Sequence, residues 1–197
     1  DERSLDSFTE KQLKEFNSIY SQMELKEGVL KHIANTGGIE RHPKARLDMV
    51  RLGIGLYGIS SLGSKSELLP VGSFKSYISQ IRKVPPGEGI GYGQHDKSDK
   101  ERDIAVVAVG YADGYSRAFS RGEGYFLVGG RKAKVVGNVC MDMTMCDVSG
   151  IDCREGDEVI IFGDKPRVEE LAENIGTIPY EILTNVSDRV NRVYFQE

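Results

Sequence analysis

The spacing of apolar residues predicts a helix near the start of the chain. Thr9 and Gln12 fit a capping box, so we expect the helix to begin there and to end before Gly28. Its apolar positions recur every three or four residues and form one face: Leu13, Phe16, Ile19, Tyr20 and Met23.

Two short apolar runs follow, at residues 29–34 and 49–52, and both are predicted to be strands. The loop at 35–38 and a polar stretch separate them, which is α/β alternation. A pair of parallel strands does not form a stable sheet alone, because such strands need cover on both faces. Residues 1–60 are therefore expected to be the last βα units of a TIM-like barrel.

After a polar, glycine-containing linker at 60–65 the pattern changes, and we place a second domain at residues 61–197. Regular short β-runs broken by glycine predict an antiparallel β-barrel or sandwich. The runs are 74–84, 104–109, 125–128, 134–139, 143–148 and 158–162. Run 104–109 is continuously apolar, as in a strand buried on both faces. We also expect a hairpin at Gly129 and Gly130, a helix at 168–175 and a closing strand at 192–195. The expected class is α+β.

The composition and charge of the chain exclude several classes of function. The net charge is −4 with mixed signs, so neither a nucleic-acid surface nor a membrane surface is expected. There is no apolar run long enough to span a bilayer and no secretory signal. The odd cysteine count indicates free thiols in a reducing cytoplasm: Cys140, Cys146 and Cys153. Neither these cysteines nor the three histidines form a metal-binding pattern.

Candidate chemistry lies in four glycine-rich or polar motifs. Residues 89–93 read Gly-Ile-Gly-Tyr-Gly, and the glycines leave Tyr92 on an unhindered backbone, although alone this pattern is more typical of an exposed turn. Residues 50–58 read Val-Arg-Leu-Gly-Ile-Gly-Leu-Tyr-Gly, 109–117 read Val-Gly-Tyr-Ala-Asp-Gly-Tyr-Ser-Arg, and 139–143 read Val-Cys-Met-Asp-Met. In this order and spacing, the motifs resemble the C-terminal half of the alanine racemases, which use pyridoxal phosphate (PLP). The resemblance covers nearly the whole chain.

The resemblance implies roles for five residues. Tyr92 would be one of two catalytic acid/bases and would serve the active site of the other subunit. Arg51 would face the pyridine nitrogen of PLP, because a guanidinium is always protonated and donates without giving up its proton. Thr36, Gly53 and Ile54 would hold the phosphate through a hydroxyl and two backbone N–H groups.

Further matches lie near the substrate. Tyr111, Arg117 and Met141 match family positions at the substrate entrance or the substrate carboxylate. Asp113 matches as well and is expected to hold its turn through bonds to the backbone. The family often reads Ser-Tyr-Arg-Val-Pro-Arg near its C-terminus, where the tyrosine touches the phosphate. This chain has Asp188 in place of that tyrosine, and a carboxylate would repel a phosphate.

The family lysine that carries the cofactor would lie ahead of this chain, and Lys31 does not match it. We therefore expect the C-terminal portion of an alanine racemase that interconverts L- and D-alanine for peptidoglycan, inactive alone. The resemblance implies a cytoplasmic, head-to-tail homodimer with shared active sites. Three alternatives stay open: a racemase of another small amino acid such as serine, a non-catalytic PLP-binding paralogue, and a β-barrel interaction module without chemistry, which composition alone would support.

Overall fold

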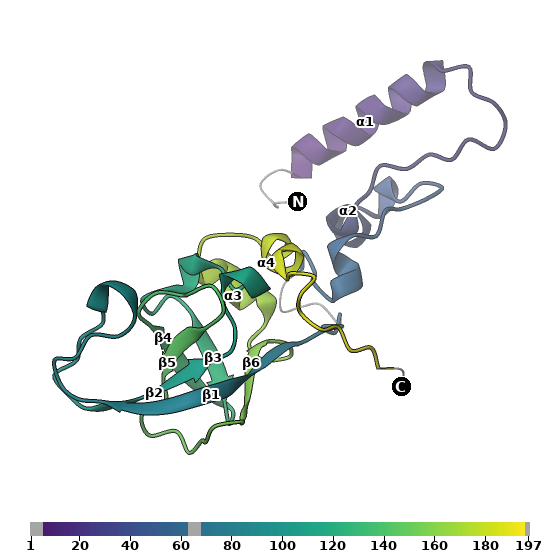
Figure 1. Cartoon of the computed structure of the whole chain (residues 1–197). Coiled ribbons are helices and arrows are strands. Elements are labelled where there is room, and N and C mark those ends of the chain that lie inside the picture. Colours follow the sequence, from purple (N-terminus) through teal and green to yellow (C-terminus); the bar gives the residue numbers. More distant parts are fainter. Residues whose placement is uncertain (1–5, 63–67, 196–197) are drawn as a thin grey trace. The chain divides into compact units, whose positions relative to one another are not determined.

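The structure is a computed structural model that describes residues 6–62 and 68–195. The chain divides into two compact units, Asp1–Val71 and Gly72–Glu197 (Figure 1). Within the described ranges, no helix is both long enough and apolar enough to cross a membrane.

The first unit opens with helix α1, Asp6–Gln22. The helix begins three residues ahead of Thr9, so the predicted capping box is wrong. Asp6 explains the earlier start, because a carboxylate in the first turn is favoured by the helix dipole and this one also pairs with the Arg41 guanidinium. None of the residues of α1 is buried within this chain.

Helix α2, Thr36–Arg41, begins where the Asn35 side chain accepts the Gly38 N–H at 3.0 Å. The flanking runs 29–34 and 49–52 do not form regular strands, so that prediction is wrong. Asp48 and Met49 both donate to the Lys31 carbonyl, and Arg51 donates to the Ala34 carbonyl. These contacts are too irregular to form a ladder, in which bonds recur evenly along parallel strands.

The second unit is a closed antiparallel barrel (Figure 1), in which the strands follow the order β1-β2-β5-β4-β3-β6 around the ring. Its strands are β1 Phe74–Val84, β2 Arg102–Val107, β3 Tyr125–Val128, β4 Arg131–Val136, β5 Thr144–Asp147 and β6 Glu158–Phe162. The expected run of six short strands is confirmed, with β1, β3 and β6 at the predicted bounds and the other three shifted by a few residues.

The β3–β4 hairpin forms where two adjacent glycines predicted it. Val128 pairs with Arg131, which leaves a two-residue loop. Gly129 and Gly130 have φ of +55° and +77°. A two-residue loop with positive φ at both positions matches the right-handed twist of the flanking strands, and glycine enters this region without strain.

Alternate residues of the strands face opposite sides of the barrel wall. Ala105, Cys146 and Val135 pair across β2, β5 and β4 and are fully buried toward the interior. Tyr115 stacks on Phe119 in the same core, with ring centroids 4.5 Å apart.

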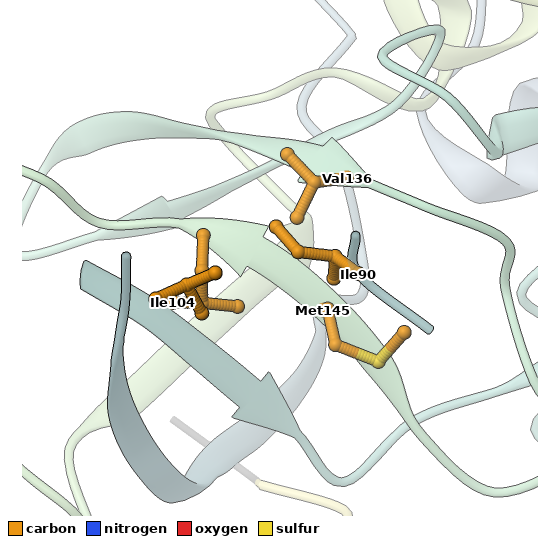
Figure 2. Close-up of a cluster of buried hydrophobic side chains, with 5 residues drawn as sticks. Ile90, Ile104, Val136 and Met145 are labelled. Carbon is orange, nitrogen blue, oxygen red and sulfur yellow. The ribbon is translucent and has the colours of Figure 1, made fainter. Parts of the chain in front are cut away.

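The next row of the same strands, Val106, Met145 and Val136, faces the other side of the wall. Ile90 covers this row from the loop between β1 and β2, and the cluster also includes Val84 and Ile104 (Figure 2). The continuously apolar run at 104–109 is thereby explained, because both faces of β2 are covered.

Two helices follow the barrel strands. Helix α3, Val168–Asn174, buries Val168, Leu171 and Ala172. Helix α4, Pro179–Asn185, was not predicted, although proline at its first position is a recognised start signal. The predicted closing strand at 192–195 is wrong, because a closed barrel has no free edge with which such a strand could pair.

Replacing Gly124 with alanine is expected to destabilise the barrel. An added Cβ would collide with the Tyr115 hydroxyl and lie 2.7 Å from the Phe119 Cβ, and both side chains are fully buried. We expect the free energy of unfolding in urea to fall by about 1–3 kcal/mol.

The matched control is Gly72→Ala, because a Cβ at Gly72 meets nothing within 4 Å. Its free energy of unfolding should stay within about 0.5 kcal/mol of the parent chain. Equal unfolding midpoints for the two variants would contradict the packing described around Gly124.

Candidate functional site

Tyr92 lies on a loop whose backbone is held while its side chain is exposed. It begins a 3₁₀ turn, Tyr92–Gln94, with Gly91 at φ +67° just before it. The Ile90 N–H donates to the His95 carbonyl at 3.1 Å and closes the loop. Ile90 is 5% exposed and Tyr92 is 77% exposed. The loop therefore anchors one side chain in the barrel wall and presents the phenol two residues later.

An open hollow of about 480 Å³ lies beside this loop. Four predicted site residues line it: Tyr92, Tyr111, Arg117 and Met141. Its other lining residues are Asn138, Val139, Cys140, Asp142 and Met143. Tyr111 and Arg117 also line a second, more polar hollow of about 260 Å³. The second unit thus brings together an acid/base candidate, a cation and an apolar side chain.

The rim of the hollow is built from two segments joined through their backbones. The N–H groups of Tyr111 and Ala112 donate to the carbonyls of Cys140 and Met141, each at 3.0 Å. Asp113 accepts the Gly110 N–H at 2.8 Å, which confirms its predicted part in holding the turn.

Arg189 ties the C-terminal segment to both parts of this rim. Its Nε lies 2.9 Å from Asp113 Oδ1, and its Nη2 donates to Asp142 Oδ1 at 2.6 Å. The hydrogen bond to Asp142 and the charge of Asp113 raise the pKa of Arg189 above its ordinary value. Sequence reasoning did not select Arg189, Asp142 or Asn138, because their partners are distant along the chain.

The thiols near the barrel differ in their surroundings. Burial raises the pKa of Cys140 at the hollow, and the Arg117 guanidinium opposes that rise. Burial also raises the pKa of Cys146 inside the barrel to about 12, and the charges of Cys153 and Asp147 add to the effect. Cys146 is therefore a neutral thiol in the folded chain at ordinary pH.

The predicted cofactor residues of the first unit gather at one turn. Thr36 is buried, and its Oγ1 accepts the N–H groups of Gly53 and Gly55, each at 3.1 Å. No acceptor for the Thr36 hydroxyl proton is found among the described residues. The Ile54 N–H, at the start of the 3₁₀ turn Ile54–Tyr57, likewise has no acceptor there. Arg51 is exposed and forms no ion pair within residues 6–62 and 68–195.

Asp188 lies in the second unit with its side chain fully exposed. Its Oδ1 is 4.0 Å from Arg192 Nη2, at the limit of an ion pair. An exposed pair of this kind contributes little to stability. Among the described residues, Asp188 therefore has no contact that fixes its direction.

Alkylation with iodoacetamide at about pH 8 should label Cys140 and Cys153 well before Cys146, because the thiolate is the reactive form and burial suppresses it at Cys146. Peptide mass spectrometry would give the rate at each site. In denaturant the three rates should become similar. Labelling of Cys146 in the folded chain as fast as Cys140 would contradict its burial.

The two units define a class of protein: an α+β chain in which a segment with helices and no regular strand among its described residues precedes a closed antiparallel barrel with a polar hollow. The family profile described as "Alanine racemase, N-terminal domain" matches residues 1–61, and "Alanine racemase, C-terminal domain" matches residues 71–194. The chain therefore belongs to the alanine racemase family. This confirms the predicted fold class, the end of a barrel domain followed by a β-domain.

Curated relatives agree with this assignment. The alanine racemase of Desulfosudis oleivorans is 39% identical over 194 residues, which cover 93% of this chain and 50% of that protein. The alanine racemase of Desulforamulus reducens is 43% identical over 197 residues, which cover 95% of this chain and 53% of that protein. The chain spans about half the length of the relatives it matches.

Solved structures share the fold. The alanine racemase from Bartonella henselae with covalently bound pyridoxal phosphate aligns with a TM-score of 0.90 and 31% identity, over 96% of this chain and 52% of that one. The alanine racemase of Clostridium difficile 630 in complex with cycloserine aligns with a TM-score of 0.86 and 38% identity, over 95% of this chain and 52% of that one.

Proposed function

We propose that this chain is the C-terminal part of a PLP-dependent alanine racemase that interconverts L- and D-alanine. The observation that carries the proposal is the gathering of Tyr92, Tyr111, Arg117 and Met141 around one hollow. Relatives along the whole chain are named alanine racemases, which supports the same substrate. In the cell, the enzyme would supply D-alanine for peptidoglycan from the cytoplasm, where thiols such as these stay reduced.

The turn at Thr36 and Ile54 has donors suited to a phosphate. The Thr36 hydroxyl proton and the Ile54 N–H both lack an acceptor among the described residues, and a phosphate would accept both. The Gly53 N–H donates to Thr36 Oγ1, so Gly53 would orient the threonine rather than donate to the phosphate. Arg51 would donate from its exposed guanidinium to the ring nitrogen.

Asp188 gives no corresponding support for a phosphate. Its carboxylate is an acceptor only, and its side chain is free of any close donor but Arg192 within the described residues. We therefore assign phosphate binding in this chain to the Thr36–Ile54 turn.

When bound, PLP would withdraw electrons from the amino acid and so acidify its α-proton. Tyr92 would take this proton from L-alanine through its phenol oxygen, and a lysine outside this chain would act on the other face. Arg117 lines the same hollow and would bring a positive charge to it. Met141 and Tyr111 would limit the access of larger substrates and of water.

The test is D-alanine formation from L-alanine by the full-length racemase that contains this sequence, supplied with PLP. Tyr92→Phe should lower kcat by at least about 100-fold, because phenylalanine removes the only proton-transfer group at that position. Tyr77→Phe is the matched control, since Tyr77 is an exposed tyrosine on β1 outside the hollow. The same enzyme should turn over serine more slowly than alanine.

Undiminished activity of Tyr92→Phe would overturn the role of Tyr92, and a parent enzyme without racemase activity would overturn the function.

We further propose a head-to-tail homodimer in which Tyr92 serves the site of the partner subunit. A side chain that is 77% exposed at the edge of an open hollow suits a site completed by a second chain. Mixing two inactive full-length variants, Tyr92→Phe and one that lacks the cofactor lysine, should restore activity, because one site of each mixed dimer then has both groups intact. Absence of recovery after subunit exchange, verified by mass, would contradict the shared site.

A further inference from the structure

The residues next to Tyr92 in the sequence do little to restrain its backbone. Gly91 and Gly93 flank it with φ of +67° and +79°, and glycine moves easily among such conformations. The phenol is largely exposed, so its own side chain does not fix the loop. A group that transfers a proton must nevertheless be held within a fraction of an ångström of its reacting partner.

Asn138 supplies a contact to Tyr92 itself. The Asn138 Nδ2 donates to the Tyr92 carbonyl oxygen at 3.1 Å, from the segment that joins β4 to β5. Within the described residues, this amide is the side-chain group that hydrogen-bonds to Tyr92. It acts on the backbone and leaves the phenol free.

The Asn138 side chain is itself oriented. Arg121 Nε donates to Asn138 Oδ1 at 3.2 Å, so the amide oxygen faces Arg121 and the amide nitrogen faces Tyr92. The Arg121 N–H also donates to the Gly137 carbonyl at 2.8 Å, and the Val139 N–H donates to Ser120 Oγ at 3.0 Å. Both neighbours of Asn138 are thereby fixed to the segment that carries Arg121.

The contact at Asn138 lies between two other attachments of the loop. Ile90 enters the hydrophobic cluster on the barrel wall (Figure 2). At the other end, the Asp96 carboxylate accepts the Gly137 N–H. Ile90 and Asp96 hold the ends of the loop, and Asn138 restrains the residue that carries the phenol.

We propose that Asn138, oriented by Arg121, is a positioning residue that holds Tyr92 for proton transfer. This inference rests on the proposed racemase function. Loss of the amide donor would leave the two flanking glycines free to rotate, and the phenol would spend less time at the reacting atom. Substrate binding would change little, because the candidate substrate residues Tyr111, Arg117 and Met141 stay in place.

The deciding variant is Asn138→Asp in the full-length racemase. Aspartate has the same shape and keeps an oxygen for Arg121, but it replaces the N–H donor with a charged oxygen facing the Tyr92 carbonyl. We expect kcat to fall roughly tenfold while KM stays within about twofold. Asn174→Asp is the matched control, because it makes the same change at an exposed residue at the end of α3 and should leave both constants unchanged.

Hydrogen–deuterium exchange measured by mass spectrometry gives a readout that does not depend on activity. Peptides that cover residues 89–96 should exchange faster in Asn138→Asp, while peptides from β3 and β6 keep the rates of the parent. Unchanged exchange in 89–96, or a fall in kcat that accompanies faster exchange throughout the barrel, would overturn the proposal. A parent enzyme without racemase activity would refute the proposed function, whereas unchanged loop exchange would refute the Asn138–Tyr92 contact itself.

Discussion

The packing of Ile90 on the barrel wall is the interaction on which the candidate site depends. Val106, Met145 and Val136 lie side by side on adjacent strands, and without a cover this apolar row would face water. Burial of such surface is favourable by about 25 cal/mol per Å². The long connection between β1 and β2 therefore packs against the barrel wall through Ile90, and Tyr92 lies two residues after Ile90.

This arrangement combines a fixed anchor with a glycine-rich sequence. Glycines allow the turn and keep bulky atoms away from the phenol, but they do not restrain it. Restraint comes instead from groups on neighbouring connections: Asn138 at Tyr92 and Asp96 at the end of the loop. Arg189 acts similarly on the other side of the hollow, where it joins Asp113 and Asp142. Polar contacts between the loops that join the barrel strands thus hold the residues of the candidate site in place.

Closure of the barrel has consequences beyond stability. β3 meets β6 through two residue pairs, Leu127 with Ile160 and Val128 with Val159, and this short contact completes the ring. A complete ring leaves no edge for another strand. The apolar tail at 193–195 is therefore exposed within this chain, although its composition is typical of a strand.

Much of the fold and part of the site followed from sequence alone. Alternating short runs and the Gly129–Gly130 pair predicted the strands and one hairpin, because local periodicity and positive φ are properties of neighbouring residues. The four motifs in their order carried the resemblance, and the resemblance predicted both the family and Tyr92 as the candidate acid/base. Only the tertiary structure revealed the cover that Ile90 provides, the Arg189 clamp and the Asn138 contact. The Asn138–Tyr92 and Arg189–Asp142 contacts join residues 46 and 47 positions apart, and a local sequence pattern contains no information about contacts over such a separation.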